Sequence, residues 1–413
     1  MQRFSRQFLV LDGQTILFSL AANRANTAPP NGTPEPVNGT LEPANGTLEP
    51  AFPTVTEALD LDAKIGQMLM LGFRGLELKP DDAIVQDARE RNLGAVVLFQ
   101  YDGALKSWTR NIASPAQLQA LNAALQEYAR TPLLISVDQE GGEVSRLNER
   151  NGFPATRSQE FYGTQNDTNL TRAAAEAQGK LLRAMGINLN LAPVVDVKLN
   201  PNNPIIAKRQ RSFSADPHIV AAQALAAIAG YHSQNILTAL KHFPGHGSSS
   251  ADTHQGLTDV TAAWREIELT PYKNIIAASQ ADAIMTAHIF NANLDAQYPA
   301  TLSKKIITGL LREQLNYDGV VITDDMQMGA ISKYYGFEQA LELALDAGVD
   351  MIAIANNLVY EPDIAARTIG IVKQLVMDGK ISEQRIDESY QRIMKLKARL
   401  NNLRLMIDGW YSA

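Results

Sequence analysis

The chain of 413 residues contains no cysteine, which excludes disulfide bonds and metal sites that need a thiolate ligand. This absence does not indicate a compartment, because a cysteine-free protein suits an oxidising or a reducing environment equally. The chain also lacks an excess of positive charge: its net charge is −7 at pH 7, and it contains no long basic run. Both features argue against a nucleic-acid partner. No apolar run approaches the roughly 18 residues of a transmembrane helix, so we expect no stable membrane span.

The N-terminal segment, residues 1–54, lacks the apolar pattern of a folded core. Arg3 and Arg6 precede two apolar stretches, 8–11 and 16–22, an arrangement that resembles a secretory signal peptide. Polar residues at 12–14 interrupt the apolar part, so the alternative is a disordered tail or a misassigned start.

A tandem heptad repeat follows, with the sequences NGTPEPV, NGTLEPA and NGTLEPA over residues 31–51. The repeat is rich in Gly, Pro and Glu and carries almost no large apolar side chains, so it cannot form a core. We interpret residues 1–54 as a signal-like stretch with an extended, disordered spacer, and residues 55–413 as one folded domain. A spacer after a signal-like stretch favours export or a place in the cell envelope, with the cytoplasm as the alternative.

The pattern changes at residue 55, where apolar runs begin to alternate with segments of helical spacing. The chain is 45% apolar, which is enough for a large core. The runs are continuous and not alternating, as expected for parallel strands that are buried on both faces. The eight predicted strands span residues 66–73, 94–99, 132–138, 188–196, 236–241, 283–288, 319–324 and 351–355.

Eight strands that alternate with helices predict an α/β protein with a single (β/α)8 barrel of the TIM type. The alternative is an open, doubly wound sheet. That fold needs a glycine-rich phosphate-binding turn after the first strand, and residues 72–75 (GFRG) are not such a turn. Ser114, Pro115 and Gln117 match an N-cap, a first-turn proline and a capping box, so they predict the start of a helix. The last helix is expected over residues 382–401.

Polar side chains follow most of the predicted strands at the point where each strand ends. In a barrel these ends meet at one face, which is the face that carries active sites. One Asp after a strand is more often a helix cap or a turn former, but most of the strands share the feature, which predicts a pocket. The strand-end residues are Asp138, Asp196, Lys241, His242, His288, Asp324, Asp325 and Asn356. The pattern supports a pocket without naming its reaction.

The segment 241–254 (KHFPGHGSSSADTH) holds three of the six histidines and leaves the end of the fifth predicted strand. Its proline and glycines forbid a helix and require a tight turn, so we expect a loop. His242 and His246 have the i, i+4 spacing of a zinc-binding helix. Pro244 and Gly245 prevent that helix, which argues against a catalytic metal.

Asp252 and His254 lie two residues apart on the same predicted loop. At this spacing a carboxylate can orient an imidazole and stabilise its charged form, which makes a general acid/base pair. The alternative from spacing alone is two solvated loop residues. Asp324 closes an apolar strand, where a carboxylate can serve as a nucleophile, a ligand or a cap. Residues 138–142 (DQEGG) place two carboxylates at a turn, which suits sugar hydroxyls or a cation.

The segment 241–254 resembles the KHFPGHG…D-(S/T)-H signature of glycoside hydrolase family 3, in its β-N-acetylglucosaminidase branch. Further segments agree with this family in the same order along the chain, and the resemblance covers about residues 56–400. These segments are 61–67 (LDAKIGQ), 137–146 (VDQEGGEVSR), 186–204 (GINLNLAPVVDVKLNPNNP), 211–213 (RSF) and 322–328 (ITDDMQM). Several ordered motifs make the resemblance highly specific.

The resemblance implies a (β/α)8 barrel and a retaining mechanism through a covalent glycosyl-enzyme. Asp324 matches the family's nucleophile, because it is the first acid of the Asp-Asp pair, and Asp325 does not. His254 matches the acid/base and Asp252 matches its partner. The residues that match the binding site for the terminal sugar are Asp138, Arg146, Arg211, Lys241 and His242. The family implies no metal and no organic cofactor.

The implied activity is that of an exo-acting β-N-acetylglucosaminidase, which hydrolyses terminal β-linked N-acetylglucosamine from muropeptides or chitooligosaccharides. The expected partner is therefore a small carbohydrate, and we expect the protein to be a monomer. One alternative is a β-glycoside phosphorylase, since a histidine is not anionic and phosphate could replace water as the acceptor. Another is a β-glucosidase of the same family. A non-catalytic sugar-binding barrel is disfavoured, because Asp324 and His254 are both present.

The sequence departs from the family pattern at several places. Residues 207–210 lengthen the loop before Arg211, which leaves Arg209 as the alternative sugar-binding arginine. Glu143 stands where a basic residue is frequent, which suggests a different outer subsite. The chain ends soon after the last predicted helix, without the second domain that supplies a Glu acid in many family 3 β-glucosidases. An acid from within the barrel, His254, is therefore expected.

Overall fold

The computed structural model describes most of the chain, in the ranges 10–11, 14–15, 60–253 and 256–410, with side chains over 60–253 and 256–400. The chain divides into two units, Met1–Thr56 and Glu57–Ala413. In the first unit, β1 (Val10–Leu11) pairs with β2 (Gln14–Thr15) in an antiparallel ladder. The rest of the predicted signal-like stretch and the whole heptad repeat lie outside the described residues. The boundary at residue 54 and the disordered spacer therefore stay predictions.

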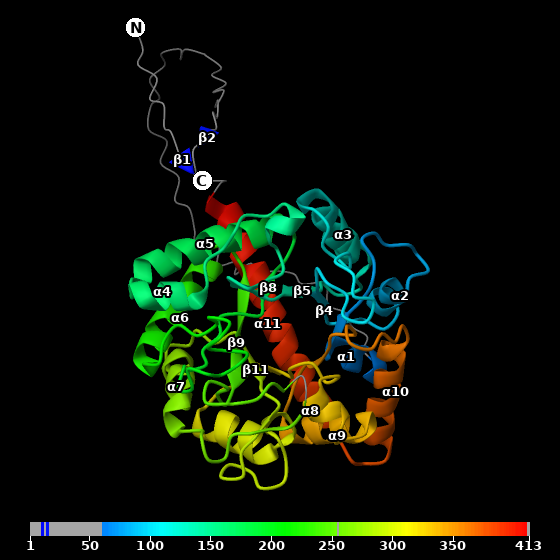
Figure 1. The fold of residues 1–413 in the computed structure, drawn as a ribbon. Coiled ribbons are helices and arrows are strands. Elements are labelled where there is room, and N and C mark those ends of the chain that lie inside the picture. The colour runs from blue at the N-terminus through cyan, green and yellow to red at the C-terminus, as the bar shows by residue number, and fades with distance from the viewer. Residues whose placement is uncertain (1–9, 12–13, 16–59, 254–255, 411–413) are drawn as a thin grey trace, which may run out of the picture. The chain divides into compact units, whose positions relative to one another are not determined.

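Eight parallel strands form the centre of the second unit, with helices around them (Figure 1). Their order in the sheet follows the chain, and the last strand lies beside the first. The strands are β3 (Leu69–Gly72), β4 (Ala95–Leu98), β5 (Leu134–Val137), β8 (Leu189–Asn190), β9 (Leu237–Phe243), β11 (Ala283–Thr286), β13 (Val320–Ile322) and β14 (Ile352–Ile354). A parallel bridge between Ile322 and Met351 joins β13 to β14, and the Met351 N–H donates to Val321 O at 3.0 Å. The predicted (β/α)8 barrel is confirmed, and the doubly wound alternative is wrong.

Every residue of the eight barrel strands is buried. One face of each strand packs into the barrel interior, and the other face packs beneath the helices. Neither face meets water, so the strands need no alternation of polar and apolar side chains. This is the physical reason for the continuous apolar runs in the sequence.

Helices connect the strands, as the alternation of the sequence patterns predicts. The α-helices are α1 (Leu61–Gln67), α2 (Ala83–Arg89), α3 (Pro115–Tyr128), α4 (Gln159–Gln165), α5 (Thr168–Ala184), α6 (Pro217–His232), α7 (Thr270–Ala277), α8 (Gly329–Ser332), α9 (Phe337–Ala347), α10 (Ile364–Met377) and α11 (Glu383–Trp410). A π-helix, η4 (Lys305–Gln314), follows β12, and short 3-10 helices span η1 (Glu149–Asn151), η2 (Glu266–Leu269) and η3 (Ala300–Leu302). Two small sheets lie at the strand ends: the β6 (Gln139–Gly141) and β7 (Val144–Ser145) hairpin, and the parallel pair β10 (Thr258–Asp259) and β12 (Ile289–Phe290).

The predicted start of α3 is confirmed. The Ser114 hydroxyl accepts the Gln117 N–H at 3.3 Å, and Pro115 occupies the first turn. The Gln117 side chain accepts from the Ala113 N–H at 2.8 Å, one residue before the position that a capping box prescribes.

The first predicted strand starts too early. Gly66 and Gln67 end α1, and the strand begins at Leu69. Gly66 serves a close approach between two backbones, because a Cβ at this position would lie 1.8 Å from Arg91 O. The glycine therefore marks helix packing and not the start of a strand.

Two further strand boundaries differ from the prediction. The fourth strand is shorter than expected, because β8 covers only Leu189–Asn190 and Pro193 has no N–H for a ladder. The fifth strand is longer, since β9 runs to Phe243. Lys241 and His242 consequently lie inside a strand, where the barrel fixes them more firmly than a loop would.

Helix α11 packs across the end of the barrel that is opposite to the carboxyl ends of the strands. Lys397 Nζ donates to Gln67 Oε1, shortly before β3, and Arg392 donates to Asp350, shortly before β14. The helix continues to Trp410, past the predicted end near residue 401, since no proline or glycine interrupts it before Gly409. Among the described residues, no helix combines the length and the apolar character that crossing a membrane requires.

Lys397 is buried against the barrel with 6% of its surface exposed, and Gln67 Oε1 lies 2.7 Å from its Nζ. Burial lowers the pKa of Lys397 from 10.5 to about 7. In the unfolded chain the lysine keeps its proton up to about pH 10.5. Between these two values the unfolded chain binds more protons, so the free energy of unfolding rises with pH. Below about pH 7 both states carry the charge, and the penalty for burying it is constant.

We expect Lys397→Met to be more stable than the wild type below about pH 7. The substitution removes the cost of burying the lysine charge, which is roughly 3–5 kcal/mol. It also leaves the Gln67 side chain without its partner, which costs about 1–3 kcal/mol. The difference should shrink as the pH rises towards about 10, where the wild-type lysine is neutral when folded. Urea unfolding across this range measures the effect, and Lys395→Met, at an exposed lysine of the same helix, is the matched control. A difference that does not change with pH would contradict the assignment.

Candidate active site

A cavity of about 200 Å³ opens at the carboxyl ends of the barrel strands. It collects side chains from the ends of β4, β5, β9, β13 and β14 and from the loop after β8. Six residues that the sequence assigns to the site line this cavity: Asp138, Arg146, Arg211, Lys241, His242 and Asp324. The positions are far apart in the sequence, and the parallel arrangement of the strands brings them together.

Asp138 follows β5 directly and forms ion pairs with two cationic side chains. Its Oδ1 accepts from Lys241 Nζ at 2.6 Å, and its Oδ2 accepts from Arg146 Nη2 at 3.0 Å. Burial alone would raise the pKa of Asp138, but the charges of Lys241 and Arg146 outweigh it and hold the pKa well below its ordinary value. Asp138 is therefore ionised at neutral pH, with its orientation fixed from two sides.

Glu140, on the β6–β7 hairpin, holds Arg211 and Lys241. Arg211 donates from Nε at 2.7 Å and from Nη2 at 2.8 Å in a bidentate pair, and Lys241 Nζ lies 2.7 Å from Glu140 Oε1. Burial opposes the charged form of Lys241, yet the charges of Asp138 and Glu140 raise its pKa overall. Arg211 thus belongs to this network, whereas Arg209 is exposed at the rim of the cavity.

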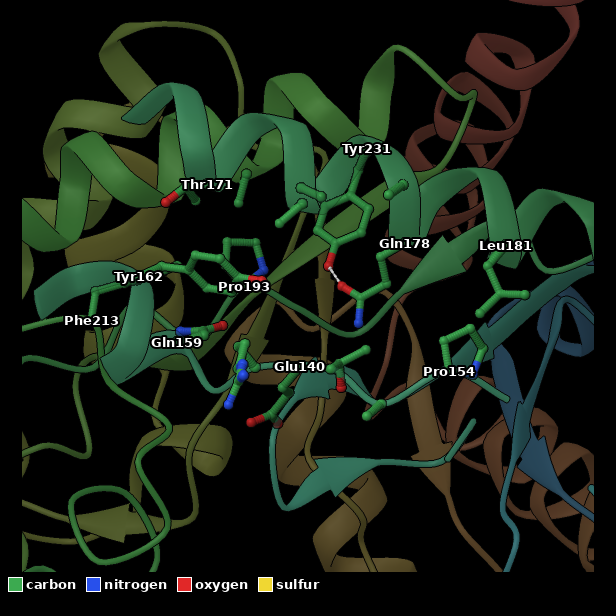
Figure 2. A pocket seen from close by; sticks show the side chains of 17 residues that line it. Glu140, Pro154, Gln159, Tyr162, Thr171, Gln178, Leu181, Pro193, Phe213 and Tyr231 are labelled. Atoms are coloured by element: carbon green, nitrogen blue, oxygen red, sulfur yellow. Dashed lines mark hydrogen bonds between the residues drawn. The ribbon is translucent and has the colours of Figure 1, made fainter. Parts of the chain in front are cut away.

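A second cavity, of about 280 Å³, lies behind Glu140 between α4, α5 and α6 (Figure 2). Phe213 and Tyr162 contribute to its largely apolar wall, and across it the Tyr231 hydroxyl donates to Gln178 Oε1. The Glu140 side chain is 1% exposed. This burial keeps its ion pairs away from bulk water, which strengthens the attraction between the charges.

Asp196 is fully buried and fixes two histidines. Its Oδ2 accepts from His242 Nδ1 at 2.7 Å, and its Oδ1 accepts from the His246 backbone N–H at 2.7 Å. Arg211 Nη2 lies 3.3 Å from His242 Nε2, and because a guanidinium only donates, Nε2 accepts and Nδ1 carries the proton. Burial lowers the pKa of His246 to about 4, so this ring is neutral at neutral pH.

The loop of residues 244–250 is held by groups that lie later in the chain. Gly245 has a φ of 123°, and a Cβ there would lie 2.6 Å from Glu268 Cβ. Glu268 accepts from the Gly247 N–H at 2.9 Å, and burial raises the pKa of Glu268 to about 7. Trp264 Nε1 donates to the carbonyl of residue 244 at 3.2 Å. Trp264 therefore supports the loop from behind and is not part of the cavity wall.

The structure describes only one of the two predicted acid/base residues. Asp252 is half-buried in the wall of a neighbouring cleft, and Thr253 is buried and lines the strand-end cavity. His254 lies outside the described residues. The pairing of Asp252 with His254 therefore stays a prediction.

Asp324 and Asp325 follow β13 and have different surroundings. Asp325 Oδ1 accepts from the N–H of Ala355 at 2.9 Å and from the N–H of Gln327 at 3.1 Å, so it fastens the turn to the next strand. Asp324 is half-buried, and its Oδ1 accepts from the Asp325 N–H at 2.8 Å. Both residues line the cavity, but the contacts of Asp325 give it a role in the turn.

No group of three or more His, Asp or Glu side chains in the described part of the chain is arranged to hold a metal ion. The rings of His242 and His246 have centroids 5.9 Å apart and lie nearly edge to face. Each imidazole instead has a protein partner at Nδ1, Asp196 for His242 and the Ser249 hydroxyl for His246. Asp196 and Ser249 therefore fix the orientation of the two rings.

Three carboxylates that position the site were not identifiable as such from the sequence. Asp196 and Glu140 were visible only as a strand-end and a turn acid, and nothing in their spacing indicated that they hold His242 and Arg211. Glu268 carried no signal, because it lies in η2, about 20 residues after the loop whose backbone it binds.

Comparison with known proteins finds relatives over most of the chain. A family model described as "Glycosyl hydrolase family 3 N terminal domain" matches residues 60–396. Beta-hexosaminidase A of Pseudoalteromonas piscicida is 36% identical over 366 residues, which are 81% of this chain and 60% of that protein. Beta-hexosaminidase of Xylella fastidiosa (strain M23) is 37% identical over 298 residues, which are 70% of this chain and 83% of that protein.

Solved structures agree with the family match. A glycoside hydrolase family 3 beta-N-acetylglucosaminidase from Paenibacillus sp. str. FPU-7 superimposes with a TM-score of 0.76 at 38% identity, over 83% of this chain and 63% of that one. Beta-N-acetylhexosaminidase from Beutenbergia cavernae DSM 12333 gives 0.73 at 28% identity, over 83% of this chain and 99% of that one. The chain thus spans less than two thirds of the Pseudoalteromonas and Paenibacillus proteins. From the family match and the shared barrel, the chain belongs to glycosyl hydrolase family 3.

Proposed function

We propose that the protein is a retaining, exo-acting β-N-acetylglucosaminidase, which removes terminal β-linked N-acetylglucosamine from muropeptides or chitooligosaccharides. The observation that carries the proposal is one strand-end cavity that contains Asp324 together with the ion network of Asp138, Lys241 and Arg146. Relatives named beta-hexosaminidase and a structural neighbour named beta-N-acetylglucosaminidase support the substrate class. We expect the protein to act as a monomer and without a cofactor.

Asp324 is the proposed nucleophile and His254 the proposed acid/base. The Asp324 carboxylate attacks the anomeric carbon, and the bond to the leaving oxygen breaks as His254 transfers a proton to that oxygen. A covalent glycosyl-enzyme results. His254 then takes a proton from a water molecule, whose oxygen attacks the anomeric carbon and releases Asp324, so the configuration is retained. Asp252 orients the imidazole and stabilises its charged form.

The proposed sugar-binding groups are already fixed before a ligand arrives. Asp138 offers carboxylate acceptors, while Arg146 and Lys241 offer donors, and their mutual contacts at 3.0 Å or less keep them in place. Such preorganised groups need little rearrangement during the reaction. The cavity of about 200 Å³ is smaller than the roughly 300–1,000 Å³ of pockets for drug-sized ligands. Its size suits one terminal sugar ring, which supports exo action.

A panel of 4-nitrophenyl β-glycosides tests the proposed specificity. We expect kcat/KM for the N-acetylglucosaminide to exceed that for the glucoside and the xyloside by at least about tenfold, or about 1.4 kcal/mol. The anomer released first, followed by NMR, should have the β configuration of the substrate.

Three results of the same panel would contradict the proposal. A preference for the glucoside would favour a β-glucosidase. Release of a sugar 1-phosphate in phosphate buffer would favour a phosphorylase. Binding without turnover of any glycoside would indicate a sugar-binding protein.

A further inference from the structure

We propose that a subsite for the leaving-group sugar lies beside the strand-end cavity, and that Arg209 in this subsite selects a leaving group that carries a carboxylate. The inference rests on the proposed function and extends it to the other side of the scissile bond. The subsite would make the protein prefer acidic over neutral oligosaccharides among the proposed substrates.

The subsite is a cleft of about 660 Å³ that adjoins the strand-end cavity. Ile205 and Arg209 line both, so the two spaces share a wall. The strand-end cavity has room for one sugar ring, and the second ring of a substrate must therefore lie outside it. The adjoining cleft is the space into which such a substrate extends.

One wall of the cleft belongs to the proposed acid/base loop. Ser250, Ala251 and Asp252 form this wall, and Asp252 is the proposed partner of the acid. A leaving oxygen has to lie within hydrogen-bond reach of the acid that protonates it. A sugar attached through that oxygen consequently meets this wall first, which identifies the cleft with the leaving-group side.

Arg209 differs from the other cations around the cavity. Arg146, Arg211 and Lys241 each form an ion pair with a carboxylate at 3.0 Å or less. Arg209 is exposed, and no hydrogen bond or ion pair joins it to any residue in the described part of the chain. A guanidinium that has no protein partner can bind a carboxylate of a ligand through two parallel hydrogen bonds.

The backbone around Arg209 is fixed, although the side chain is exposed. The Lys208 N–H donates to Asn203 O at 3.0 Å, and the Gln210 N–H donates to Ala207 O at 3.0 Å. These bonds hold the lengthened loop that precedes Arg211. The fixed loop therefore places Arg209 at the junction of the two spaces.

The cleft also offers a face on which a sugar ring can pack. Tyr334 and Leu257 line the cleft and are 57% and 39% exposed, respectively. Ligand sites combine such apolar and aromatic surfaces with a few polar groups that set orientation. The C–H face of the second sugar rests on this surface while its carboxylate turns to Arg209.

The test compares kcat/KM for two β-1,4-linked disaccharides, N-acetylglucosaminyl-N-acetylglucosamine and N-acetylglucosaminyl-N-acetylmuramic acid. They share the terminal sugar, and only the second carries a carboxylate. We expect the wild type to prefer the acidic disaccharide, and Arg209→Ala to lower the ratio of acidic to neutral kcat/KM roughly 10- to 100-fold. Arg209→Lys should retain part of the preference, because it keeps the charge but loses the bidentate geometry.

Lys208→Ala is the matched control, since Lys208 is the exposed neighbour and lines neither space. Its ratio should equal that of the wild type, and added salt should weaken the wild-type preference. An unchanged ratio in Arg209→Ala, or an equal fall in Lys208→Ala, would overturn the subsite. A folding defect lowers both rates and leaves the ratio intact. If 4-nitrophenyl N-acetylglucosaminide is turned over but no acidic preference exists, only the subsite fails, whereas no turnover at all refutes the proposed function.

Discussion

Replacing Asp324 with Ala is expected to lower kcat by roughly 10⁴-fold or more while the barrel stays folded. Without this carboxylate no glycosyl-enzyme can form, so the reaction loses its first step. The fold should persist, because Asp324 lies beyond the end of β13 at Ile322 and is only half-buried. Turnover of 4-nitrophenyl N-acetylglucosaminide and a thermal melt measure the two parts of the expectation.

Asp325→Asn is the matched control for this variant. The asparagine keeps an oxygen that can accept from the N–H groups of Ala355 and Gln327, so the turn should hold. We expect its kcat to fall far less than that of Asp324→Ala. A 2-fluoro sugar with a good leaving group should label the wild type, and peptide mapping should place the adduct on Asp324. An adduct on Asp325 would refute the assignment.

Removing His254 is expected to slow substrates with poor leaving groups by roughly 10²–10⁴-fold, and activated aryl glycosides far less. Only a poor leaving group needs a proton at the moment when its bond breaks. Asp252→Ala should cause similar losses, because the carboxylate orients the imidazole and raises its basicity. The plot of log kcat/KM against the pKa of the leaving group should become steeper in both variants.

The double variant should be little slower than His254→Ala, since groups that act as one unit are not additive. A double-mutant cycle on kcat/KM with leaving groups of graded pKa measures the coupling. Replacing Ser250, an exposed residue of the same loop, with Ala controls for disturbance of the loop. Independent, fully additive losses would mean that the two residues do not form a pair. Equal losses with all leaving groups would mean that His254 only binds and that the proton has another source.

The barrel followed from the sequence because its strands are buried on both faces. Burial on both sides leaves continuous apolar runs such as 94–99 and 132–138, which are easy to find. Strand boundaries were less accurate where packing decides them. Gly66 looked like the start of a strand but ends a helix that packs against Arg91 O. Pro193 lies inside the predicted fourth strand, where it interrupts the ladder.

That most of the predicted site residues gather at one face also followed from the sequence. Residues such as Asp138 and Lys241 stand at or near the end of a strand, and all strand ends of a barrel meet at one face. The partners of these residues did not follow. That Glu140 holds Arg211 and Lys241 depends on distances across the barrel, which spacing along the chain does not encode.

The sequence by itself determined the fold class, the face that carries the site, and the family that the motifs identify. Local properties carry this information: burial sets the apolar pattern, and the direction of each strand sets where its polar end points. Tertiary structure alone decided which charges pair. It pairs Arg211 with Glu140 and places Arg209 at the rim of the strand-end cavity, because the lengthened loop folds back on residues 203 and 207. It also buried Asp196 and Glu268 beneath the catalytic face, where long-range packing and not local sequence determines their contacts.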